Sequence, residues 1–165
     1  RHKKEAYVES NVIAAYLDYF FPSEIKATPD TKAALADAEE TLNGFFPAVA
    51  GYLKDVDGDD DENAESFANL KEKLGALEDH LEDAGDAYLD LSGNPDSFSI
   101  LDCRLVPQLY HLSVGIEKFK NNRPSLETEF PRVHSYLQRS MERPSFQATL
   151  YSPETIEWGW GNARQ

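Results

Sequence analysis

The side chains in this sequence that are best suited to chemistry are one thiol, four imidazoles and a run of carboxylates. Cys103 is the only cysteine, so no disulfide can form within the chain, and a reducing compartment is the simpler expectation. Its thiol could serve redox chemistry. However, Cys103 falls on an apolar helical stretch, where a free cysteine usually packs as a small inert hydrophobe. We therefore expect Cys103 to face the interior.

The histidines do not indicate a metal site. His2, His80 and His134 lack the mutual spacing that is typical of metal ligands. His111 belongs to a Leu-Tyr-His motif, and its simplest interpretation is a packed, hydrogen-bonded side chain.

An acidic run between residues 55 and 65 holds seven carboxylates and no basic residue. Its alternating aspartates, at positions 55, 57, 59 and 61, resemble the start of a calcium loop. In either register the sixth position is acidic rather than glycine, and the twelfth is not glutamate. We therefore expect a solvated acidic loop and no specific metal site.

The element that must position these groups is a helix predicted over residues 99–119. Ser99 and Asp102 have the spacing of a capping box, which predicts that the helix starts there. One apolar stripe follows at helical spacing: Leu101, Leu105, Leu109, Leu112, Ile116 and Phe119. The opposite side is apolar as well, which is typical of the buried centre of a bundle. Pro107 lies inside this helix and should bend its axis.

The remaining helical patterns surround this centre. Apolar periodicity predicts helices over residues 12–20, 29–52, 63–84, 131–141 and 153–160, with a short helical turn at residues 143–146. Gly44 and Pro47 predict a break in the second of these, and a short strand is expected at residues 5–8. We expect the two tryptophans of the last helix to pack back onto the bundle. The predicted fold class is all-α, a bundle of five or six helices around a kinked central helix.

Charge is concentrated in the middle of the sequence. The chain carries a net charge of −14, of which −12 falls within residues 54–101. Such a field repels phosphate backbones and anionic lipid headgroups, so nucleic acid is excluded as a partner and membrane insertion is disfavoured. No apolar run approaches the length needed to cross a bilayer. A basic protein surface would be attracted instead.

The order of motifs resembles the helical C-terminal domain of the glutathione transferase superfamily. The Ser99/Asp102 capping motif is similar to the one that opens the central helix of that domain. Segments 45–57, 77–81, 105–112, 143–146 and 156–160 resemble those of dehydroascorbate reductases and of the related chloride intracellular channel proteins. The resemblance runs from about residue 8 to residue 160, and it places residues 23–165 in the helical domain.

The same resemblance implies that residues 1–22 are the end of a thioredoxin-like domain, namely its last strand and third helix. Glu9 and Ser10 resemble the acid-serine pair that holds the γ-glutamyl group of glutathione. A hydroxyl and free amides at a helix N-terminus suit a carboxylate, and Glu9 could pair with the ligand's ammonium group. The alternative is that Ser10 only caps the helix. His111 could face the substrate cleft, although Gln108 replaces a lysine common in the reductases.

Two functions follow from this resemblance. The parent protein could be a glutathione-dependent dehydroascorbate reductase or related thiol transferase, located in the cytoplasm or plastid stroma. The catalytic residue of that family lies upstream of this sequence, so we expect residues 1–165 alone to be inactive and assign no catalytic residue here. Alternatively, the chain is a silent interaction or assembly subunit. In either case the apolar stripe of Val12, Tyr16 and Phe20 needs a cover, either the missing thioredoxin-like domain or another protein subunit.

Overall fold

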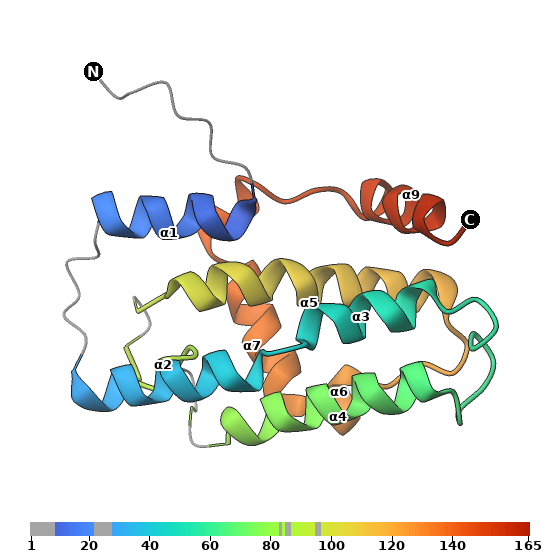
Figure 1. Cartoon of the computed structure of the whole chain (residues 1–165), viewed down its shortest axis with the longest axis horizontal. Coiled ribbons are helices and arrows are strands. Elements are labelled where there is room, and N and C mark those ends of the chain that lie inside the picture. Colours follow the sequence, from blue (N-terminus) through green and yellow to red (C-terminus); the bar gives the residue numbers. More distant parts are fainter. Residues whose placement is uncertain (1–8, 22–27, 83, 85–86, 95–96) are drawn as a thin grey trace.

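The secondary structure of the described residues is entirely helical. The computed structural model describes residues 9–21, 28–82, 84, 87–94 and 97–165. The helices are α1 (Ser10–Phe20), α2 (Pro29–Thr41), α3 (Phe45–Lys54), α4 (Glu65–His80), α5 (Ile100–Phe119), α6 (Leu126–Glu129), α7 (Pro131–Met141), α8 (Pro144–Gln147) and α9 (Pro153–Ala163). Figure 1 shows α5 in the middle of the bundle, α2 and α3 beside it, and α7 crossing it. The strand predicted at residues 5–8 lies outside the described residues.

The central position of α5 is confirmed. The Ser99 hydroxyl accepts a hydrogen bond from the Asp102 amide at 3.3 Å, and the Asp102 carboxylate accepts one from the Ser99 amide at 2.8 Å, so the capping box is complete. Leu105 and Leu112 are 1% and 0% exposed. The helix runs without interruption through Pro107. The apolar pattern and the cap together thus define the longest helix of the bundle.

Two buried carboxylates connect helices to their neighbours. Asp102 also accepts from the Leu89 amide at 3.2 Å and from the Tyr136 hydroxyl at 2.7 Å, which ties α5 to the preceding connector and to α7. Glu78 of α4 accepts from the amides of Arg132 and Val133 at 3.0–3.1 Å. Glu78 therefore caps the N-terminus of α7, whose own N-cap residue provides no side-chain bond.

The second predicted helix is broken where the sequence indicated. Gly44 has a φ of 77°, a left-handed conformation that suits glycine, and it separates α2 from α3. Beyond this break, α3 packs closely on α5. A Cβ atom added at Gly115 would lie 2.7 Å from Leu53 Cδ2, so glycine permits the close approach of these two helices.

Two expectations about the periphery need correction. Trp160 is buried against α5, but Trp158 is 72% exposed, because the two residues lie on different sides of α9. The acidic run is only partly a solvated loop. Its backbone and the carboxylate of Asp59 bind Lys120, Asn122 and Arg164, which come from distant parts of the chain.

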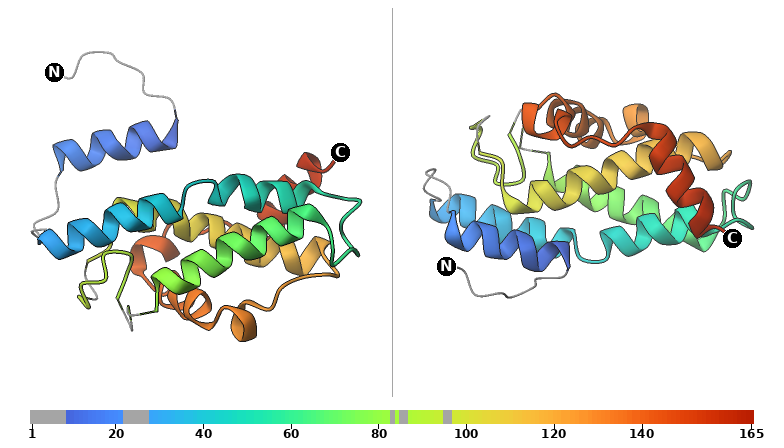
Figure 2. Two further views of the ribbon diagram at one scale, coloured as in Figure 1. Left: turned by 60° about the horizontal axis from the view of Figure 1, so that its bottom comes forward. Right: turned by 90° about the horizontal axis from the view of Figure 1, so that it is seen from above.

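The helix α1 lies at the edge of the molecule, beside α5 and apart from the main bundle (Figure 2). None of its described side chains is buried. Val12, Leu17 and Phe20 are about half exposed, at 48%, 48% and 51%, whereas Tyr16 is partly covered and contacts the Phe20 ring at 4.5 Å. The apolar stripe predicted for this segment is therefore largely uncovered in this chain.

Candidate functional site

Glu9 occupies the N-cap position of α1. Its carbonyl accepts from the amides of Val12 and Ile13 at 3.1 Å, and its side chain makes no capping bond with the described residues. Ser10 is the first helical residue and so stands one position inside the cap. The side chain of Ser10 lies outside the described residues.

The backbone of Glu9 is strained. Its φ of 77° and ψ of 121° lie outside the regions that L-residues favour. Such a conformation costs about 1–3 kcal/mol and is concentrated at ligand-binding and catalytic sites. This conformation was not predictable from the residue type, because Glu9 is neither glycine nor asparagine.

A broad pocket of about 1080 Å³ lies between the start of α1, the α2–α3 junction and α5. Glu9 lines one part of it, and Cys103, Arg104 and Gln108 of α5 line another. Glu39 and Glu40 add negative charge, while Arg104 is the basic residue among its lining groups. The pocket therefore offers carboxylates for an ammonium group and a guanidinium for an anionic group.

Cys103 lies on the wall of this pocket, and the expectation that it faces the interior is wrong. Helical geometry places Cys103 and Pro107 on the open side of α5, opposite the buried Leu105 and Leu109. Although the residue is exposed overall, neighbouring groups desolvate its sulfur. That desolvation, together with the charge of Asp102, raises the pKa of the thiol. Cys103 is therefore mainly a protonated thiol at neutral pH and a weak nucleophile.

A second, smaller pocket of about 300 Å³ lies on the other side of Cys103 and Pro107. His111 and Tyr110 line it from α5, and Phe146 and Tyr151 line it from the C-terminal region. Aromatic and aliphatic groups dominate its walls, as in pockets that hold small organic molecules. His111 and Cys103 both line this pocket.

The environment of His111 combines the two interpretations that the sequence left open. The side chain is half-buried, and its ring meets Trp160 edge to face at a centroid distance of 6.3 Å. It also lines the smaller pocket. Desolvation lowers the pKa of His111 below its ordinary value of 6.5, so the ring is mainly neutral at pH 7. A neutral imidazole can donate or accept one hydrogen bond to a bound molecule.

Sequence reasoning missed Tyr151 as a lining residue of this pocket and Trp160 as the ring that contacts His111. The Tyr110 hydroxyl donates to the Tyr151 carbonyl at 3.0 Å, which holds the segment before α9 against α5. This contact joins residues 41 positions apart, so no local pattern indicates it. Within the part of the chain that the structure describes, no group of three His, Cys, Asp or Glu side chains is arranged to hold a metal ion.

Comparison with known proteins identifies a domain family to which part of this chain is similar. Residues 60–139 match the family model described as the glutathione S-transferase C-terminal domain. The helical bundle is therefore similar to the glutathione S-transferase C-terminal domain. The match includes α4, α5 and nearly all of α7, so the Ser99/Asp102 cap and the central helix lie within the matched region.

Curated relatives extend the similarity to nearly the whole chain. Glutathione S-transferase DHAR3, chloroplastic, from Arabidopsis thaliana is 29% identical over 153 residues, covering 92% of this chain and 52% of the relative. Probable glutathione S-transferase DHAR1, cytosolic, from Oryza sativa subsp. japonica is 29% identical over 152 residues, covering 92% and 63%. The chain thus spans between half and two thirds of the length of these relatives. None of the helices in the described part of the chain has the length and hydropathy of a membrane span.

Proposed function

We propose that this chain is the helical part of a glutathione-dependent reductase of the dehydroascorbate reductase type, and that residues 1–22 belong to a thioredoxin-like domain. The DHAR relatives, which align with 92% of the chain, support the class of enzyme. The exposed apolar side chains of α1 support a further domain, because the bundle itself leaves them uncovered. The chloroplastic and cytosolic names of the relatives support the plastid stroma or the cytosol as its location.

In this proposal Glu9 and Ser10 hold the γ-glutamyl end of glutathione. The observation that carries the proposal is the strained Glu9 at the start of α1, on the wall of the larger pocket. The Glu9 carboxylate would pair with the ammonium group of glutathione, while the first amides of α1 and the Ser10 hydroxyl would bind its carboxylate. The positive end of the helix dipole favours the same negative charge.

The smaller pocket would receive the second, oxidised substrate. His111 would donate or accept a hydrogen bond there as a neutral imidazole, and the apolar walls would exclude water. Residues 1–165 alone would have no turnover. Their single thiol, Cys103, has a raised pKa and is poorly suited to act as the redox nucleophile. The nucleophile would come from the thioredoxin-like domain.

The test uses the protein expressed from its complete coding sequence and the variants Glu9→Gln and Ser10→Ala. Each variant loses one charge-assisted or hydroxyl contact to glutathione, so the KM for glutathione should rise about tenfold or more, with a small change in kcat. Glu72→Gln, on the exposed face of α4, is the matched control and should leave the KM unchanged. Unchanged KM values in both test variants would contradict the assigned glutathione site.

A second candidate function, a silent assembly subunit, is favoured by the same exposed face of α1. In that case another protein subunit, rather than a thioredoxin-like domain, would cover Val12, Tyr16 and Phe20. The mass of the purified 165-residue chain in solution, measured by light scattering, separates the two. A mass equal to that of one chain, with no other subunit bound, would argue against assembly through α1. A stable oligomer that dissociates in the Phe20→Ser variant would favour assembly.

A further inference from the structure

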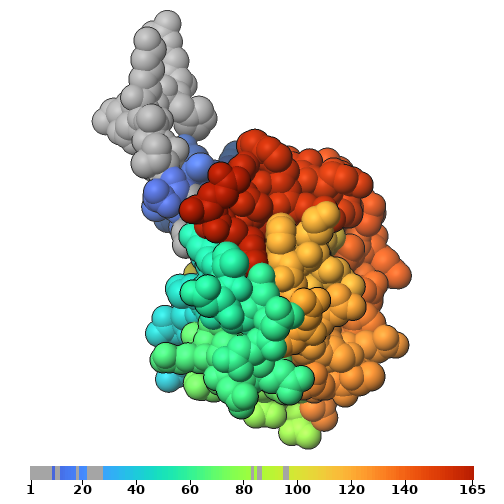
Figure 3. Space-filling view, turned by 90° about the vertical axis from the view of Figure 1, so that its right-hand side faces the viewer, coloured from blue at the N-terminus to red at the C-terminus, as the bar shows by residue number. Residues whose placement is uncertain are grey.

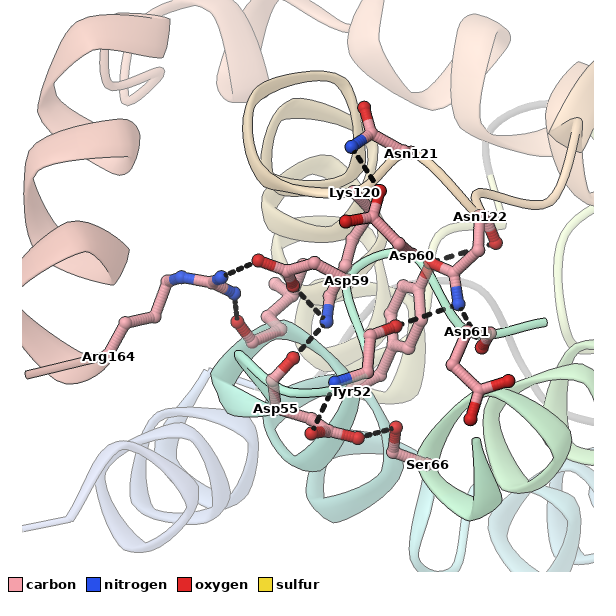
Figure 4. Close-up of polar contacts among 12 residues, drawn as sticks. Tyr52, Asp55, Asp59, Asp60, Asp61, Ser66, Lys120, Asn121, Asn122 and Arg164 are labelled. Atoms are coloured by element: carbon pink, nitrogen blue, oxygen red, sulfur yellow. Dashed lines mark hydrogen bonds and ion pairs between the residues drawn. The ribbon is translucent and has the colours of Figure 1, made fainter. Parts of the chain in front are cut away.

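The carboxylate of Asp59 binds two cations that come from distant parts of the chain. Its Oδ1 atom lies 2.6 Å from Lys120 Nζ, just after the end of α5, and its Oδ2 atom accepts from the guanidinium of Arg164, just after the end of α9 (Figure 4). Asp59 itself belongs to the acidic loop between α3 and α4. One side chain therefore joins the ends of the central and last helices to this loop.

The two cations are removed from solvent and bound on several sides. The side chains of Lys120 and Arg164 are 0% and 10% exposed. Lys120 also donates to the Asp55 carbonyl and lies 4.6 Å from the centre of the Tyr52 ring. Arg164 also donates to the Leu53 carbonyl and lies 4.8 Å from the centre of the Phe119 ring. Both cations depend on Asp59, because buried charges need a compensating partner.

The loop that carries Asp59 is held in place independently of α9. The amides of Asn121 and Asn122 donate to the Asp59 carbonyl at 3.1 and 3.2 Å, and the Asn122 side chain donates to the carbonyls of Gly58 and Asp61. Figure 3 shows this face, where the segment around residues 50–65 meets the end of α5 below the C-terminal segment. The loop is thus held in place by α5-side residues, and Arg164 at the end of α9 binds to it.

The remaining contact between α9 and the bundle is mainly apolar packing on α5. Only Ile156 and Trp160 are buried on this helix of 11 residues. An exposed ion pair between Lys118 and Glu157, at 2.9 Å, adds little, since such pairs in water contribute weakly. At the other end, the bond from Tyr110 to the Tyr151 carbonyl holds the segment that enters α9. The helix is therefore attached by polar bonds at both ends and packs on α5 between them through two buried side chains.

We propose that Asp59, Lys120 and Arg164 form a latch that holds α9 as a strap across α5, and that this latch sets the position of Trp160 against His111. The acidic loop thereby influences the surroundings of His111, which lines the smaller pocket, although the loop lies at the other end of α9. Asp59 and Arg164 are positioning residues in this arrangement, acting on His111 through α9.

Hydrogen exchange of the whole protein tests the latch. Arg164→Gln removes the attachment from the side of α9 and leaves the pair of Lys120 and Asp59 intact, so the bundle should stay folded. The amides of residues 153–163 should then exchange more than about tenfold faster, because helix opening no longer breaks a buried ion pair. Asp59→Asn should have the same or a larger effect. Where Asp59→Asn does not fold, Arg164→Gln alone decides the test.

Two matched controls keep the test specific. Asp57→Asn makes the same charge change in the same loop, at an exposed residue. Glu157→Gln removes the exposed ion pair between the same two helices. Both should leave exchange in α9 unchanged. Equal exchange in Arg164→Gln and the parent protein, or equally fast exchange in the two controls, would overturn the latch.

The titration of His111 by NMR tests the coupling to the pocket. Release of α9 withdraws the Trp160 ring, which rehydrates the imidazole. In Arg164→Gln the pKa of His111 should therefore move up toward 6.5, while Glu157→Gln should leave it in place. An unchanged His111 titration in a variant whose α9 exchanges rapidly would overturn the coupling.

Discussion

At the scale of single residues, Asp102 determines more of this structure than its place in a capping box suggests. It is fully buried and accepts hydrogen bonds from the Ser99 amide and hydroxyl, the Leu89 amide and the Tyr136 hydroxyl. These four donors come from three parts of the chain. The carboxylate therefore fixes the start of α5 and its packing against α7 at once.

Asp102→Asn should lower the free energy of unfolding by about 2–4 kcal/mol, because the new amide nitrogen would face donors that now bind an oxygen. Urea denaturation followed by circular dichroism measures this change. Asp79→Asn, at an exposed position of α4, is the control and should change stability by less than about 0.5 kcal/mol. Equal stability of the two variants would show that Asp102 contributes no more than a surface aspartate.

His111 should make the stability of the protein depend on pH. Its pKa is lowered in the folded state by desolvation, so the unfolded chain binds a proton more readily. The contribution is fully present above pH 6.5 and is lost as the pH falls through the folded pKa. His111→Gln should flatten the fall in stability below pH 6.5, measured by urea denaturation at several pH values. If the variant retains the full slope, His111 is not the group responsible.

Residue roles could be predicted from the sequence only where the partners are close in the chain. The capping box needs Ser99 and Asp102 alone, and it was confirmed. The role of Asp59 depends on Lys120 and Arg164, which lie 61 and 105 positions away, so it was read as a loop carboxylate. Cys103 was placed on the wrong side of α5 because both sides of the helix are apolar, and only packing decides which one stays open.

At the scale of elements, most helices could be predicted from apolar periodicity, and most helix ends from the positions of proline and glycine. The helices predicted at residues 63–84, 131–141 and 153–160 correspond to α4, α7 and α9, with shifts of a few residues at the ends. The break at Gly44 was confirmed. The cap that Glu78 provides for α7 was not predictable, since it joins residues 54 positions apart through tertiary packing.

The contact between α3 and α5 depends on Gly115. In Gly115→Ala the new methyl would lie 2.7 Å from the fully buried Leu53 side chain, which has little room to move. We expect a loss of about 1–3 kcal/mol in unfolding free energy, measured by thermal and urea denaturation.

Gly75→Ala in α4 is the matched control for this helix contact. Its new methyl has open space around it, so alanine should stabilise the helix by about 0.5–1 kcal/mol. A Gly115→Ala variant as stable as Gly75→Ala would contradict the close approach of α3 and α5.

At the scale of the whole molecule, the bundle forms one core, while α1 stays outside it. The core joins α3, α4, α5, α7 and α9, with buried residues from each. The helix α1 contributes apolar side chains that remain exposed and a strained N-cap at the rim of a pocket. This division supports our proposal that the domain boundary falls near residue 22 and that α1 belongs with a preceding domain.

The fold class could be predicted from the sequence because capping, periodicity and the family motifs all pointed to the same bundle. The site could be predicted only in part. Glu9 and His111 are candidates only through resemblance to a family, and their roles stay predictions, whereas the two pockets and the packing of α9 on α5 arise between distant segments. The function of the complete protein is therefore best tested on the protein from its complete coding sequence.

The most direct test is an initial-rate assay of glutathione-dependent reduction of dehydroascorbate, made on that complete protein and on residues 1–165 alone. We expect turnover by the complete protein, with saturation by glutathione, and no turnover above the uncatalysed rate by residues 1–165. Turnover by residues 1–165 alone would contradict the placement of the nucleophile outside them. A complete protein without glutathione-dependent activity would contradict the proposed reductase.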